Sequence, residues 1–125
     1  MQYLLLIYEE EKIWTTMPES ERMQIYGEYR KYTDEIKASG HWKGGNPLQP
    51  THTATTVRVR GGKVSTTDGP FAETREQLGG YYLVEAKDLD EATKLAARIP
   101  SAQWGSVEVR PVMQLPPDYP RPGKA

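Results

Sequence analysis

The stretch that decides the fold is "TDGPFAETREQLGGYYLVEA", residues 67–86. It opens on an Asp-Gly-Pro-Phe turn, passes through a short acidic segment, and ends in a Gly-Gly pair followed by mostly apolar residues. Gly69 permits the turn and Pro70 fixes its backbone. Residues 79–86 have the composition of a buried strand. The stretch therefore predicts a sharp turn that leads into a central strand, with polar residues beside it that raise the question of a functional site.

A hairpin is predicted immediately upstream, in "TATTVRVRGGKVSTT", residues 53–67. Its first half alternates, so Val57 and Val59 point to one face while Arg58 points to the other. The Gly61-Gly62 pair supplies a two-residue turn with positive φ angles.

Two helices are predicted, one on either side of these strands. Residues 16–40 begin with Thr16 and Glu19 in the spacing of a capping box, with Pro18 in the first turn and Gly40 as the C-terminal cap. Residues 88–99 begin with Asp88 as the N-cap. Each helix has an apolar stripe at helical spacing, formed by Ile25, Tyr29, Tyr32 and Ile36 in the first and by Leu89, Ala92, Leu95, Ala96 and Ile99 in the second.

The remaining strands are predicted at residues 3–8, which form an apolar run buried on both sides, and at residues 106–112. Residues 41–52 are rich in Gly and Pro and are interpreted as a loop with at most a short extended piece. The order β-α-β-β-β-α-β predicts an α+β fold of ferredoxin-like plan, with an extra strand or hairpin in its antiparallel sheet.

Two helices can cover only one face of such a sheet. We assign the valines to the helix-covered face, namely Val57, Val59, Val107 and Val109. The other face would carry charged residues and one tyrosine, namely Arg58, Arg60, Glu108, Arg110 and either Tyr81 or Tyr82. We interpret this mixed face as the contact surface of a homodimer with a polar cleft; an ordinary solvated sheet face is the alternative.

Composition limits the classes of function. The 125 residues indicate one domain, taken as residues 1–113, followed by a proline-rich tail, residues 114–125. There is no cysteine, which excludes a disulfide, a thiol nucleophile and a cysteine-based zinc site. The net charge of −1 gives no support to a nucleic-acid partner or to an anionic membrane surface. The apolar run at residues 3–8 is too short to span a bilayer, so we expect a cytoplasmic protein.

The quoted stretch, with "TATTVRV" before it and "VEVRPV" after it, resembles the YCII-related family, in the branch named for its Asp-Gly-Pro-Phe motif. The resemblance implies a ferredoxin-like fold that pairs as a dimeric α/β barrel, similar to muconolactone isomerases. It also implies a cleft that contains the motif aspartate, here Asp68, and a bacterial association with extracytoplasmic-function sigma factors. Some members pair a histidine with this aspartate; His41 and His52 are the two histidines here, and neither matches that role.

Acidic residues near the motif are the first catalytic candidates. Asp68, at the end of a strand, can act as a general base if burial raises its pKa, or it can simply cap a short helix over residues 70–77. Glu73 and Glu76 are three residues apart, so they can share one face of that helix and perform acid–base chemistry. Alternatively they only complement the helix dipole. Of the two, Glu73 is preferred because it lies nearer to Asp68.

Ligand-binding candidates come from the neighbouring strands. Arg58 and Arg110 can bind a carboxylate if their strands are neighbours, or they can pair with Glu108. Alternation sends Tyr81 and Tyr82 to opposite faces, so one lies in the core and the other lines the cleft. His52 is a base that works at neutral pH, or an exposed loop residue.

Two functions follow from these residues. The first is a cofactor-free protein that binds or transforms a small organic molecule, which can be anionic, in a dimer cleft. The second is a non-catalytic regulatory or binding module associated with a sigma factor. No metal site is predicted, because no histidine–carboxylate cluster has the spacing of metal ligands.

Overall fold

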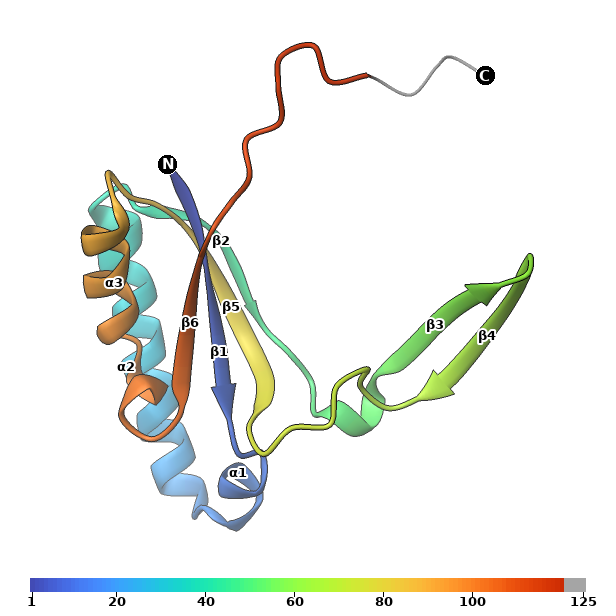
Figure 1. Cartoon of the computed structure of the whole chain (residues 1–125). Helices are drawn as coiled ribbons and strands as arrows, with labels where there is room; N and C mark the ends of the chain where they lie inside the picture. Colours follow the sequence, from blue (N-terminus) through green and yellow to red (C-terminus); the bar gives the residue numbers. More distant parts are fainter. Residues whose placement is uncertain (121–125) are drawn as a thin grey trace.

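The computed structural model describes residues 1–120, which form a four-stranded antiparallel sheet with helices on one face and a separate hairpin (Figure 1). The sheet order is β2-β5-β1-β6. Its strands are β1 (Gln2–Glu9), β2 (Trp42–Pro47), β5 (Gln77–Glu85) and β6 (Ser106–Pro111). This is the ferredoxin-like order with a hairpin inserted between β2 and β5, so the predicted α+β fold class is confirmed.

Strand β1 is central, paired with β5 on one side and β6 on the other. Its residues alternate strictly: Leu5 and Ile7 are buried, whereas Leu4 and Leu6 are only half-buried. The prediction that this run is buried on both sides is therefore wrong within one subunit. We call the face that carries Leu4 and Leu6 the open face.

Helices α2 (Glu19–Ala38) and α3 (Leu89–Ala97) cover the other face. The Tyr32 hydroxyl donates to the Leu95 carbonyl oxygen at 2.8 Å, which joins the two helices. Asp88 caps α3 as predicted, because its side chain accepts from the Glu91 amide at 2.9 Å. Leu89, predicted to belong to the apolar stripe of this helix, is instead 55% exposed.

The first predicted helix begins only after Pro18, and a short helix that was not predicted precedes it. A short helix, α1 (Lys12–Thr16), ends where the capping box was expected, and the Thr16 hydroxyl donates back to the Lys12 carbonyl oxygen at 2.9 Å. Proline disfavours helical backbone in the residue before it, and Met17 is accordingly extended, with ψ of 137°. The capping prediction for Thr16 is therefore wrong, and α2 begins after Pro18 without a side-chain cap.

Strand β2 occupies the segment that was predicted to be a loop. It pairs with β5 at the edge of the sheet, where Pro47 is tolerated as its last residue. A Cβ atom on Gly45 would lie 2.8 Å from the Tyr81 carbonyl oxygen, so this close pairing needs glycine. Apolar and polar residues hardly alternate in β2, and the strand forms through its pairing with β5.

The inserted hairpin, here called the arm, consists of β3 (Thr55–Arg60) and β4 (Lys63–Asp68) and projects away from the main sheet (Figure 1). Gly61 and Gly62, with φ of 56° and 76°, form its turn as predicted. Its valines do not face the helices: Val57 is 60% exposed and Val59 57%. That assignment is corrected for these two residues because β3 pairs only with β4.

The second pair of valines behaves as predicted. Val107 and Val109 lie opposite Ile7 and Leu5 in β1 and pack against the core beneath the helices. The arm is closed at its base, where the Gly69 amide donates to the Ala54 carbonyl oxygen at 2.7 Å. Beyond β6 the proline-rich segment is exposed up to residue 120; the rest of the predicted tail lies outside the described residues. Among residues 1–120 no helix is long and apolar enough to cross a membrane.

Alkaline pH should weaken this fold. Burial raises the pKa of Tyr29 to about 12, and burial also raises the pKa values of Tyr32 and Tyr82. The unfolded chain loses these protons near pH 10, so the stabilisation is complete below that pH and is lost between about pH 10 and 12. For Tyr29 the expected slope is about 1.4 kcal/mol per pH unit.

Urea unfolding at pH 8, 10 and 11.5, followed by circular dichroism, measures this decline. The Tyr29→Phe variant should show a shallower decline than the wild type. A free energy of unfolding that stayed constant up to pH 11.5 would contradict the prediction.

Candidate functional site

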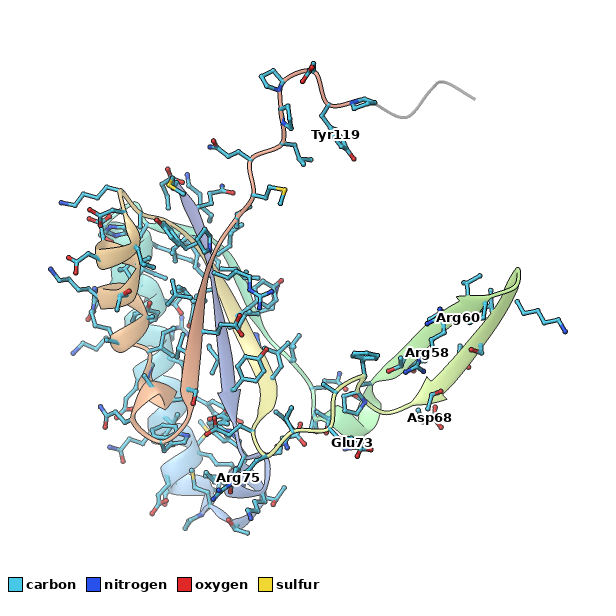
Figure 2. The ribbon with its side chains drawn as sticks, viewed as in Figure 1. Arg58, Arg60, Asp68, Glu73, Arg75 and Tyr119 are labelled. Atoms are coloured by element: carbon cyan, nitrogen blue, oxygen red, sulfur yellow. The ribbon has the colours of Figure 1, made fainter. Side chains whose placement is uncertain are left out.

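The acidic and basic residues predicted around the motif lie on or near the arm (Figure 2). Asp68 is the last residue of β4 and is exposed. Arg58, on β3, is half-buried because its guanidinium lies over the Phe71 ring, 5.5 Å from the centroid. Glu73 is exposed in the segment 69–76, which is irregular where a short helix was predicted. Asp68 therefore ends a strand and does not cap a helix.

The other candidates lie on the open face and at the base of the arm. Tyr81 is on the open face, where its hydroxyl accepts from the Asn46 side-chain amide at 2.9 Å, whereas Tyr82 is buried in the core. Arg110 is on β6 and pairs with Glu108. His52 is exposed in the 3-10 turn η1 (Thr51–Thr53). Because Arg58 and Arg110 belong to different sheets, their strands are not neighbours within one subunit.

A cavity of about 830 Å³ lies at the end of β1, between α1, the segment 69–76 and the start of β6. We call it the β1-end cavity. Apolar and aromatic side chains supply part of its wall, notably Tyr8, Ile13, Trp104 and Val107. Polar side chains supply the rest, namely Glu10, Thr74, Arg75, Glu76, Ser106 and Glu108. The cavity thus combines aromatic surface with three carboxylates and one guanidinium.

Two of the three carboxylates have a cationic partner. Arg75 Nε donates to Glu10 Oε1 at 3.0 Å, and Lys12 Nζ lies 3.5 Å from Glu10 Oε2. The hydrogen bond from Arg75, together with the charge of Lys12, lowers the pKa of Glu10. Glu108 pairs with Arg110. Both groups therefore already have their charge matched at the rim of the cavity.

The third carboxylate, Glu76, is in a different position. Its Oε1 accepts from the neutral Ser106 hydroxyl at 2.8 Å. The residue is half-buried at the end of the irregular segment, directly before β5. A carboxylate whose partner is a single hydroxyl group has further acceptor sites for a bound hydroxyl group. Of the two glutamates weighed from the sequence, Glu76 lines the cavity and Glu73 does not.

Behind the cavity, the carboxylate of Glu9 is fixed by two indoles. The residue is only 7% exposed. Its Oε1 accepts from Trp14 Nε1 at 2.7 Å and its Oε2 from Trp104 Nε1 at 2.9 Å. Trp14 belongs to α1 and Trp104 follows the 3-10 turn η2 (Pro100–Gln103), so one carboxylate ties both segments to the end of β1. The Trp104 wall of the cavity is held in place by this pair of bonds.

Sequence reasoning missed Glu9, Glu10, Arg75 and the tryptophans. The run Glu9–Glu10–Glu11 directly after an apolar strand is the signal that was available, since alternation sends its first residue inward. The tryptophan partners are 5 and 95 residues away from Glu9. Only the fold brings them together. Within residues 1–120, no group of three or more histidine and carboxylate side chains is placed to hold a metal ion.

Comparison with known proteins gives a family and a fold. Residues 1–116 match the family described as YCII-related domain. An uncharacterised protein of Rhizobium meliloti (strain 1021) is 34% identical over 119 residues, covering 94% of this chain and 96% of that protein.

A solved structure is also similar: 5-chloro-2-hydroxyhydroquinone dehydrochlorinase (TftG) from Burkholderia phenoliruptrix AC1100, in complex with 2,5-dihydroxybenzoquinone. The TM-score is 0.52 at 16% identity, covering 90% of this chain and 94% of that chain. At this identity the likeness shows the fold alone. None of these descriptions refers to a sigma factor, so the predicted regulatory association gains no support from them.

Replacing Glu9 by Gln should destabilise the protein by about 1–3 kcal/mol. The amide nitrogen of Gln would face an indole N–H, so one buried donor would lose its acceptor. Urea unfolding followed by tryptophan fluorescence measures the change. Glu28→Gln, an exposed change on α2, is the matched control and should have little effect. Equal stability of the two variants would rule out this role of Glu9.

Proposed function

The chain belongs to the YCII-related domain family, and on this premise we propose that it binds a small, uncharged, hydroxyl-bearing ring compound in the β1-end cavity. The observation that carries the proposal is Glu76, a half-buried carboxylate with a neutral partner, set among aromatic walls. The narrower branch named for the Asp-Gly-Pro-Phe motif stays a prediction.

The charge of the cavity favours an uncharged ligand over the anionic one considered from the sequence. Three carboxylates line it against one guanidinium, and that guanidinium is bound to Glu10. Lys12 and Arg110 are further cations beside Glu10 and Glu108, so Glu76 is the carboxylate in this cavity whose partner is neutral. An anion bound beside Glu76 would be repelled, whereas a neutral hydroxyl group can donate to it in a charge-assisted hydrogen bond. Tyr8 and Trp104 offer ring faces and edges against which a planar ligand can pack.

The fold relative described above is compatible with this class of ligand. It is named for activity on a chlorinated hydroxyhydroquinone, and a dihydroxybenzoquinone is bound in its structure. In the present chain, Glu76 would accept a hydrogen bond from one ligand hydroxyl. The same carboxylate can take the proton of that hydroxyl as a general base, which is the step from which a transformation of the ligand would begin.

The second part of the proposal is a homodimer formed through the open face. Leu4, Leu6 and Leu83 are half-buried there within one subunit. A partner that covers the open face would complete their burial, which is worth at most about 1 kcal/mol for each leucine, because most of its surface is already buried. Tyr81 and Arg110 lie on this face, and we propose that they line the cleft between protomers.

Hydroquinone is a suitable probe because it is a neutral ring with two hydroxyl groups. Titration calorimetry with the full chain should detect saturable binding. Glu76→Gln should weaken the binding about tenfold or more, because hydrogen bonds to charged groups are worth about 1.5–3 kcal/mol.

The control is Glu28→Gln, which changes the same net charge on an exposed position of α2 outside the β1-end cavity. It should leave the affinity of hydroquinone unchanged. No binding to the wild type, or equal weakening by both variants, would refute the proposed ligand class.

A further inference from the structure

The arm presents an apolar face that nothing in its own subunit covers within the described residues. Register places Val59 opposite Val64, and Val57 opposite Thr66, on the same face of the two strands. The exposed fraction is 57% for Val59, 69% for Val64 and 60% for Val57. Arg58, Arg60 and Lys63 lie on the other face. The arm is therefore amphipathic, although its two strands form a sheet of their own.

An isolated two-stranded hairpin is marginally stable in water, and its stability ordinarily comes from further strands or from packing against another element. The arm is attached to the body at its base, through Gly69 and Ala54. Its six-residue strands extend beyond that point by about 20 Å. An extended hairpin with a row of exposed valines is thus a surface built to contact something outside its own subunit.

We propose that the arm packs its valine face on the open face of a second copy of this chain. The inference rests on the homodimer proposed above and specifies how that dimer is held together. Figure 1 shows the arm projecting on the side of the sheet away from α2 and α3, the side on which a partner would meet the open face.

The size of the open face supports a second copy with an arm. Four strands about 4.8 Å apart and about 20 Å long offer about 400 Å². A stable interface buries about 800 Å² per partner. Contact across the open face alone is therefore small. When each arm docks on the open face of the other protomer, every protomer buries its own arm as well as its open face, in the self-complementary interface that a symmetric dimer requires.

The distribution of charge along the chain also supports a second copy as the partner. The arm carries three cations, Arg58, Arg60 and Lys63, and one carboxylate, Asp68, whereas the whole chain has a net charge of −1. The rest of the chain therefore carries a net charge of −3. A cationic arm is attracted to the acidic body of another copy, which steers the two together at low salt.

Docking of the arm would also place the motif aspartate, Asp68, at the interface with the partner. Asp68 pairs with Thr55 in the same register as the valines, so its side chain belongs to the valine face. Tyr81 and Arg110 belong to the open face. Candidate residues that lie apart in one subunit would therefore approach one another between protomers.

Sedimentation at several protein concentrations tests the arm. Val59→Thr with Val64→Thr keeps residues that favour strands but removes the apolar contact. Arg60→Gln with Lys63→Gln changes the adjacent cross-strand pair on the other face. At about 0.5 M salt, where charges are screened, the valine variant should raise the dimer dissociation constant at least tenfold, while the control should change it less than twofold.

A monomeric wild type, or equal weakening by the two variants, would overturn the proposal. In the first case the valines would serve a partner other than this chain. Hydroquinone binding distinguishes this failure from failure of the proposed ligand, because Glu76 and the aromatic walls of a single protomer supply the contacts proposed for the ligand.

Location can be tested directly because the chain has no cysteine. The Lys63→Cys variant, at natural isotope abundance, carries a spin label and is mixed with isotope-labelled wild type. Only the wild-type protomer gives NMR signals, so any broadening reports its contact with the labelled arm of a partner. The methyl groups of Leu4, Leu6 and Leu83 should broaden. A label on Lys94→Cys, on α3, should leave them sharp. Sharp leucine signals with the Lys63→Cys label, in a sample that sediments as a dimer, would show that the arm lies elsewhere.

Discussion

A four-stranded sheet has two faces, and the helices α2 and α3 cover only one of them. The burial pattern of the sheet follows from that constraint. Every second residue of β1 points to the covered face, where Leu5 is fully buried. The uncovered face keeps half-buried leucines, which is more apolar surface than water favours. The open face is therefore the surface on which we propose a partner, and the arm between β2 and β5 is the element proposed to reach it.

The β1-end cavity depends on a second constraint, the cost of burying a charged carboxylate. The buried carboxylate of Glu9 offsets this cost by accepting hydrogen bonds from two neutral indoles, Trp14 and Trp104, which come from segments far apart in the chain. The same two bonds that satisfy the charge therefore position a wall of the cavity. Glu76 lies on the accessible side of that wall with a serine as its partner. One glutamate thus organises the structure, and the other is accessible to the proposed ligand.

Local chemistry made much of the fold predictable. Asp88 as a cap, the Gly61-Gly62 turn and the alternation of β6 each act over a few residues, so the sequence alone indicates them. Strand β2 was not predicted, because its pairing comes from β5 and not from its own pattern. The valines of the arm were predicted to face the helices for a similar reason. Alternation shows that they share one face of the strand, but it does not show which element covers that face. The cavity was missed since its members come from three distant segments.

The strand order also has a consequence for biosynthesis. Strand β1 is made first, but both of its neighbours, β5 and β6, come from the last half of the chain. The apolar run of β1 therefore stays unpaired until β5 has been synthesised, and its second edge stays open until residues beyond about 105 follow, at about 5–20 residues per second. Long-range pairing of this kind slows folding. The arm, by contrast, closes through local contacts, so it can form on the nascent chain before the sheet exists.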